Sequence, residues 1–142
     1  YDAAGRVLAL NPAFERLWGA RFADVPPDYT VLEDPQLERA GVLPLVRRAF
    51  QGEAVTLPPV RYDLSIASGH VGGGRVLLTQ AHLYPVRSAA GELVEVVLTH
   101  EDVTARLVAE SELEAVAEEL QKRTAEAERA RERIARPGRT DP

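Results

Sequence analysis

The chain has 142 residues, of which 45% are hydrophobic, and a formal net charge of −5, which suits one packed domain with an appendage. It contains no cysteine, and this excludes disulfide frameworks, thiolate metal sites, cysteine nucleophiles and cysteinyl-flavin photochemistry. The sequence has no apolar run of membrane-spanning length, no signal peptide and no basic surface. We therefore expect a cytoplasmic protein with no direct membrane insertion and no nucleic-acid partner.

The first part of the chain predicts one short strand followed by helices. Residues 2–5 suit a tight turn, and residues 6–10 are typical of a short strand. The Asn-Pro pair at 11–12 predicts a helix start, because asparagine can accept a free N–H group and proline has none to lose. We expect another short helix within residues 29–39. A clearer one is expected over 43–51, where apolar residues share one face.

The middle of the chain changes to the alternating pattern of strands. We expect strands at residues 55–63, 75–84 and 93–100, and the proline pair inside the first requires an edge position or a bulge. Turns rich in glycine and small residues, at 68–74 and 88–92, join these strands. The sequence therefore predicts an antiparallel meander.

A long helix is expected after the last strand. The Asp102 carboxylate can cap its first N–H groups, and the helix can run to Arg136, where a Pro-Gly pair stops it. Its apolar stripe has the three- and four-residue spacing of a coiled-coil seam, for which the alternative is a solvated single helix. The seam consists of Leu113, Val116, Leu120, Arg123, Ala127, Ala130 and Ile134.

These patterns divide the chain into three expected parts. Residues 1–102 form a folded domain, residues 103–136 a coiled-coil helix, and residues 137–142 a disordered tail. Arg123, Ala127 and Ala130 are poor core formers, so we expect the second half of the seam to be weakly held.

Three blocks of sequence resemble one family. They are residues 2–19 (Asp-x-x-Gly-Arg-Val-x-x-Leu-Asn-Pro-Ala-Phe-x-x-Leu-Trp-Gly), residues 83–91 (Leu-Tyr-Pro-Val-Arg-x-x-x-Gly) and residues 100–104 (His-Glu-Asp-Val-Thr). In this order and spacing they resemble the PAS domain, the sensory module common in bacterial histidine kinases. The resemblance implies an α+β fold, with an antiparallel sheet flanked by short helices and followed by a long C-terminal helix. It also implies that Asp102 and Thr104 form the junction that passes a signal to this helix.

The sequence departs from the family pattern at its beginning. In the family, a first strand precedes the Asp-Gly turn and lies between the second and the last strand, whereas this chain starts at the turn. We therefore expect an N-terminally truncated domain. The core can rearrange, a neighbouring chain can supply a strand, or the sheet can keep an empty position. Because free sheet edges seek partners, we expect exchange or edge-to-edge association.

The resemblance implies a ligand pocket between the concave sheet face and the short helices. Candidate lining residues are Leu77, Thr79, Ala81, Leu98, His100, Arg61 and Phe50. His100 could bond a ligand or titrate near neutral pH, or it could be a buried ring bonded to a neighbouring backbone or carboxylate group. Arg61 and Tyr62 could clamp a carboxylate, or they could be an ordinary surface pair.

No catalytic or metal-binding pattern is present. The sequence has neither a hydrolase triad nor an HExxH motif, and the helix expected at 43–51 has no histidine to ligate haem. We expect no catalytic residue, no metal, no haem and no covalent flavin, and a small-molecule ligand stays open. Trp18, Phe14, Phe22 and Phe50 are expected in the core.

The function implied is a signal-sensing and dimerisation module of a two-component sensor histidine kinase. Binding of a ligand or partner would be relayed through Asp102-Val103-Thr104 to a coiled coil in a homodimer. The alternative is a ligand-free interaction and dimerisation module of another bacterial signalling protein, such as a cyclic-dinucleotide enzyme or a transcription regulator.

Overall fold

The computed structural model describes residues 1–64 and 76–135, so the expected turn at 68–74 and the expected tail at 137–142 lie outside the described residues. The chain divides into two compact units, Tyr1–Thr104 and Ala105–Pro142. The division falls two residues after the boundary expected at residue 102. The two units are described separately below.

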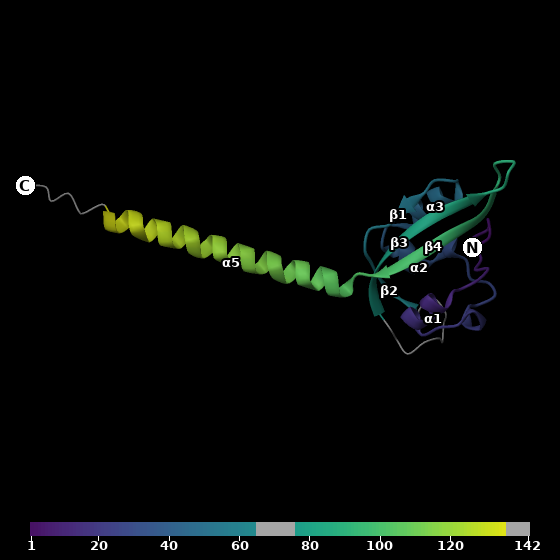
Figure 1. Ribbon diagram of the computed structural model, residues 1–142, viewed down its shortest axis with the longest axis horizontal. Coiled ribbons are helices and arrows are strands. Elements are labelled where there is room, and N and C mark those ends of the chain that lie inside the picture. Colours follow the sequence, from purple (N-terminus) through teal and green to yellow (C-terminus); the bar gives the residue numbers. More distant parts are fainter. Residues whose placement is uncertain (65–75, 136–142) are drawn as a thin grey trace, which may run out of the picture. The chain divides into compact units, whose positions relative to one another are not determined.

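Short helices cover one side of the first unit (Figure 1). The predicted helix start at Asn11 is confirmed, because its side chain accepts a hydrogen bond from the Phe14 N–H at 2.8 Å, and Gly19 ends the helix with a φ of 70°. The helices are α1 (Pro12–Trp18), η1 (Phe22–Asp24), η2 (Val31–Glu33), α2 (Pro35–Arg39) and α3 (Leu43–Phe50).

The strands form one antiparallel sheet around a long central strand. They are β1 (Val55–Thr56), β2 (Val60–Asp63), β3 (Val76–Arg87) and β4 (Leu93–Asp102). Both β1 and β2 pair with one edge of β3, and β4 pairs with its other edge (Figure 1). The proline pair between β1 and β2 interrupts the strand predicted at 55–63, because proline has no N–H to give to the ladder. The predicted meander is confirmed.

The register of β3 sets which side chains face the helices. Thr79, Ala81 and Leu83 are buried on the inner face, whereas Tyr84 is 49% exposed on the outer face. The strand continues through Pro85, which pairs with Val96, so it is longer than the sequence predicts. The inner face of the sheet is therefore the one predicted from the alternation.

The strand predicted at residues 6–10 does not form. Residues 7–11 instead line a groove of about 430 Å³ whose opposite wall is residues 95–100 of β4. At one end of this groove the Tyr1 ammonium donates to the Val96 carbonyl at 2.8 Å, and the Val96 N–H donates to the Tyr1 carbonyl at 3.0 Å. An extended segment needs a ladder partner, and residues 6–10 have none across the groove. In the single chain, this edge of β4 is contacted by Tyr1, which is hydrogen-bonded to Val96, and by Asp2, which forms an isolated bridge with Glu95.

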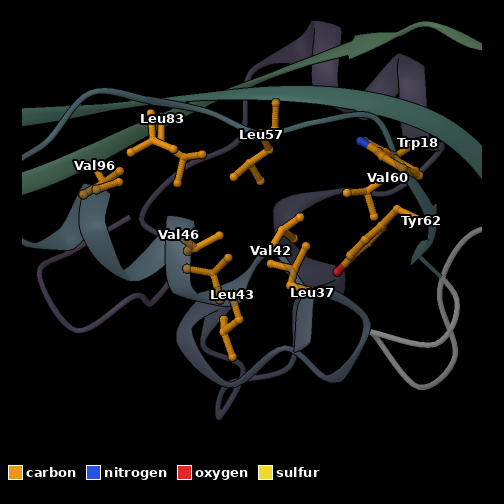
Figure 2. Packing of buried hydrophobic residues seen from close by; sticks show 14 of the residues in the cluster. Trp18, Leu37, Val42, Leu43, Val46, Leu57, Val60, Tyr62, Leu83 and Val96 are labelled. Carbon is orange, nitrogen blue, oxygen red and sulfur yellow. The ribbon is translucent and has the colours of Figure 1, made fainter. Parts of the chain in front are cut away.

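The core lies between the inner sheet face and the helices. Figure 2 shows Leu83 and Leu57 pointing from the sheet side toward Val46 and Leu43 of α3. Trp18 is 1% exposed and Val46 is fully buried, so α1 and α3 both contribute large apolar area to this layer. This packing leaves the cavity described below at the end of the core that contains Trp18.

Gly5 packs the N-terminal turn against the segment that leads into α2. It has a φ of +82°, and a Cβ atom there would lie 2.5 Å from Thr30 Oγ1 and 2.9 Å from Leu32 Cγ. We expect Gly5→Ala to lower the free energy of unfolding by about 2 kcal/mol, because backbone strain and the steric clash add. Gly41→Ala is the control, since its φ is +72° and no atom lies within 4 Å. Urea denaturation should give a smaller loss for Gly41→Ala, and equal losses would contradict the clash.

The second unit contains the helix α5 (Thr104–Ala135), except for its first residue, Thr104, which belongs to the first unit. Along the helix, Arg123 donates a hydrogen bond to Glu119, one turn earlier, at 2.8 Å. The apolar stripe is open in the single chain, with Leu113 71%, Leu120 63% and Ile134 82% exposed. Within residues 1–64 and 76–135, no helix is long and apolar enough to cross a membrane.

Candidate functional site

A cavity of about 80 Å³ lies between the inner sheet face and the helices. Its walls are mostly apolar and aromatic, which is typical of small-molecule sites. The lining residues are Tyr1, Val7, Leu10, Phe14, Trp18, Ala20, Arg21, Asp24, Val25, Pro26, Tyr29, Val31, Leu37, Leu57, Val60, Tyr62, Leu64, Thr79, Ala81, Leu98 and His100.

Four of the predicted pocket residues line this cavity: Thr79 and Ala81 from β3, and Leu98 and His100 from β4. Their alternate positions on paired strands bring them to one face. Three predicted residues lie elsewhere. Leu77 and Phe50 pack against the core, where the Phe50 ring meets Tyr1 edge-on at 6.4 Å.

Arg61 is the third predicted residue that lies outside the cavity. It is exposed on β2, opposite Leu78 in the ladder, whereas its neighbour Tyr62 is buried. Successive strand residues point to opposite faces, so this pair cannot clamp one carboxylate. Of the two interpretations of Arg61, the structure has the surface side chain.

Aromatic rings surround His100. The Phe14 centroid lies 5.5 Å from the His100 ring and the Trp18 centroid 5.6 Å, each at an interplanar angle of 87°. Burial lowers the pKa of His100 to about 4, so the ring is neutral at pH 7 and does not titrate near neutral pH. Within the described part of the chain, the buried atoms His100 Nδ1 and Trp18 Nε1 have no hydrogen-bond partner. The simple interpretation of a histidine bonded to neighbouring groups therefore does not hold at Nδ1.

A buried carboxylate organises the opposite wall of the cavity. Asp34 is 1% exposed, and its Oδ1 caps α2 by accepting the N–H groups of Gln36 at 2.8 Å and Leu37 at 3.3 Å. Its Oδ2 accepts hydrogen bonds from the hydroxyls of Tyr29, at 2.9 Å, and Tyr62. Burial, with the nearby Asp34 charge contributing, raises the pKa of both phenols. The two tyrosines are therefore held neutral, with their hydroxyls directed to Asp34.

Sequence reasoning missed Asp34 and the tyrosines around it. A local signal for Asp34 existed, because Asp34-Pro35 repeats the capping pattern of Asn11-Pro12. No local signal could place Tyr29 and Tyr62, which are 5 and 28 residues away from Asp34 in the chain. Trp18 and Phe14 were expected in the core, and they also line the cavity. The same prediction is wrong for Phe22, which is 47% exposed.

The end of β4 is fastened to β3 by the residues of the predicted junction. Val103 is 1% exposed, and its N–H donates to the Leu78 carbonyl at 2.9 Å. The Leu78 N–H in turn donates to Thr104 Oγ1 at 3.1 Å, and the Thr104 N–H donates to Asp102 Oδ1 at 3.0 Å. Leu78 immediately precedes the cavity residue Thr79. The junction is thus hydrogen-bonded to β3, the strand that also carries the cavity residue Thr79.

The cavity wall carries few polar groups. In the described ranges no cluster of three His, Cys, Asp or Glu side chains is placed to hold a metal ion. Trp18 and His100 each have a buried nitrogen atom that is unpaired among the described residues, and both side chains contact aromatic rings. The cavity can therefore enclose a small molecule and offer it a few hydrogen bonds.

Comparison with known proteins places the first unit in a family. A family profile described as the PAS fold matches residues 1–108. One similar solved structure is an RNA-binding Light-Oxygen-Voltage receptor, with 28% identity and a TM-score of 0.51, over 78% of this chain and 30% of that chain. The chain thus spans less than a third of that receptor.

A second similar structure is a sensory box histidine kinase/response regulator from Burkholderia thailandensis E264. It has 24% identity and a TM-score of 0.50, over 80% of this chain and 81% of that chain. This likeness concerns the fold alone. The search of curated proteins found no match. With the profile matching residues 1–108 and the antiparallel sheet covered by short helices, the chain belongs to the PAS family.

Proposed function

We propose that this chain is a signal-sensing and dimerisation module of a two-component sensor histidine kinase in the cytoplasm. A small molecule or partner acts on the first unit, and the Asp102-Val103-Thr104 junction relays the change to α5. No haem and no covalent flavin takes part. α5 pairs with a second copy as a coiled coil.

The observation that carries this proposal is the double hydrogen bond of Leu78 to the junction. Leu78 accepts from Val103 and donates to Thr104, while the next residue, Thr79, lines the cavity. A shift of β3 caused by a ligand would therefore change the bonds that hold the base of the helix. A ligand biases such an equilibrium only by its difference in affinity for the two states.

The exposed stripe of α5 supports the pairing. A helix of 32 residues whose Leu113, Val116 and Leu120 are all more than half exposed gains stability by burying them against a partner. Their spacing is that of alternating core positions in a two-stranded coiled coil. A second contact between copies is the edge of β4 beside the groove, where Tyr1 and Asp2 are its only backbone partners among the described residues.

The alternative is a ligand-free interaction module of another bacterial signalling protein. It is favoured by the outer sheet face, where Tyr84, Val86 and Val97 are each at least 40% exposed. A contiguous apolar surface of this kind is typical of interaction sites. A histidine kinase parent is proposed because the sensory box fold occurs in the kinase/response regulator named above.

Cross-linking of single cysteines tests the coiled coil. We expect disulfide-linked dimers for Leu113→Cys and Leu120→Cys, weaker ones for Ala127→Cys, and none for Glu118→Cys, because only the first three lie in the seam. Yields would be compared on non-reducing gels after mild oxidation. Equal yields at Glu118 and Leu120 would refute the seam.

A junction variant tests the relay. Thr104→Val removes the acceptor of the Leu78 N–H but keeps the side-chain volume, so we expect the ratio of cross-links at 113 and 120 to change. Thr99→Val is the matched control on the exposed outer face of β4 and should leave the ratio unchanged. A ratio that is the same in both variants would show that the junction passes nothing to α5.

A further inference from the structure

We propose that the cavity binds a small, uncharged molecule with a hydrogen-bond acceptor, which the indole N–H of Trp18 and the ring of His100 hold together. This inference rests on the proposed sensory function, because it names the class of molecule that the sensory cavity recognises. It is carried by the unpaired polar atoms of the cavity wall and by the charges around them.

The rings of Trp18 and His100 each contain a buried nitrogen atom that has no hydrogen-bond partner among the described residues. Trp18 is 1% exposed, its Nε1 has no partner in the described ranges, and an indole nitrogen can only donate. His100 Nδ1 is unpaired in the same way, and the two rings lie 5.6 Å apart between centroids. Buried polar groups are nearly always paired, since an unpaired one is costly. A ligand atom with lone pairs would satisfy the indole donor, and the neutral imidazole can donate to the same atom.

The charges around the cavity exclude an anion. Behind Tyr29 and Tyr62 lies the carboxylate of Asp34, which is 1% exposed and forms no ion pair with a described Lys or Arg side chain. Arg21 lines the cavity, but its guanidinium is paired with Asp24 at 3.5 Å. His100 is neutral at pH 7, because burial lowers its pKa to about 4. A buried anion would therefore meet a negative charge, and the two cations of the described lining, Arg21 and the Tyr1 ammonium, are already bonded to Asp24 and to the Val96 carbonyl.

The donors exclude a cation, and the volume limits the size of the ligand. An ammonium or guanidinium group has no lone pair for the Trp18 N–H, so Nε1 would stay unpaired. The cavity measures about 80 Å³. Since a dry cavity of about 150 Å³ binds benzene, which has six non-hydrogen atoms, this one suits a molecule, or part of one, with about three or four non-hydrogen atoms.

Four planar probes of the same shape can test the proposal. Acetone carries an acceptor, isobutene has none, acetate is an anion and guanidinium is a cation. The chain has one tryptophan, so a ¹⁵N-labelled sample gives a single indole N–H resonance that reports on Trp18. We would titrate the full chain with the three soluble probes, and with isobutene up to its solubility limit, and fit the shift of this resonance and of the Leu98 methyl groups.

We expect acetone to produce a saturable downfield shift of the indole proton and to bind about threefold to tenfold more tightly than isobutene, which is the worth of one net hydrogen bond. Acetate and guanidinium should give no saturable shift. Equal affinities for acetone and isobutene, tighter binding of either ion, or no saturation by any probe would overturn the proposal.

Two variants separate the hydrogen bond from the shape of the cavity. His100→Phe keeps a ring in the cluster and should cut the preference for acetone over isobutene by about threefold. His82→Phe is the control, because His82 lies outside the cavity and is bonded to Thr56 at 3.0 Å. An unchanged preference in folded His100→Phe contradicts the role of His100. If that variant does not fold, the four-probe series on the natural chain still decides.

The result is independent of the cross-linking experiments. Binding of acetone with no response at the junction would leave the ligand class standing and remove the relay. A relay that responds to Thr104→Val, in a chain whose cavity shows no preference for acetone, would leave the proposed function standing and remove this inference.

Discussion

Asp34→Ala is expected to lower the free energy of unfolding by about 3 to 5 kcal/mol, because it removes a helix cap and leaves two buried hydroxyls without an acceptor. The carboxylate accepts hydrogen bonds from two backbone N–H groups of α2 and from Tyr29 and Tyr62. Chemical denaturation monitored by the fluorescence of Trp18 would give the difference. The loss should include a lower denaturation midpoint with little change in slope.

Asp24→Ala is the matched control for Asp34→Ala. The Asp24 carboxylate also accepts a backbone hydrogen bond at the start of a short helix, from the Arg21 N–H at 2.9 Å. Unlike Asp34, it is only half-buried, and its ion pair with Arg21 is on the surface. We expect a loss of about 1 kcal/mol or less. A loss for Asp34→Ala no greater than that for Asp24→Ala would mean that the buried network contributes little.

The stability of the first unit should fall as the pH drops from about 6.5 to about 4 through the protonation of His100. The native state accepts this proton only near pH 4, whereas the unfolded chain accepts it near 6.5, so the unfolded chain binds more protons in this interval. Because the pKa of His100 is lowered in the native state, protonation of this group takes nothing from the free energy of unfolding above about pH 6.5. The loss attributable to this one group reaches about 3 kcal/mol at pH 4.

Carboxylates also titrate in this interval, so the measurement is a difference between variants. His100→Phe should remove the part of the pH dependence that belongs to His100, and its free energy of unfolding should therefore vary less between pH 4 and pH 6.5 than that of the natural chain. His82→Phe is the matched variant, because it makes the same substitution on the outer side of the sheet. Parallel curves for His100→Phe would refute the buried neutral ring.

Local signals explain why much of the fold was predictable. The cap at Asn11, the glycine at 19 and the alternation along β3 and β4 act within a few residues, and each is present in the structure. The Asp102 cap belongs to the same class, since its carboxylate accepts the N–H two residues later. These features required no knowledge of distant contacts.

Features that depend on distant partners were not predictable. Residues 6–10 have strand-forming side chains, but a strand exists only where a neighbour completes its ladder. The face of Arg61 depends on how the chain passes the proline pair, because a one-residue change in register reverses every side chain on β2. The cavity likewise depends on Tyr62 meeting Asp34 across 28 residues of chain.

Pro85 limits how copies of this sheet can assemble. The N–H and carbonyl of Val96 point away from β3, toward Tyr1. Pro85 is paired with Val96 across the ladder, so its backbone nitrogen points away from β4, to the edge of β3 that lies beyond the end of β1. Among the described residues, that side carries a two-residue strand, a four-residue strand and a position without a donor, which disfavour strand addition there. A fibril grows only if every copy has two sheet edges that can pair with other copies. When two β4 edges pair about a two-fold axis, neither copy has such an edge left. Backbone pairing between copies should therefore end at a closed pair and not continue into fibrils.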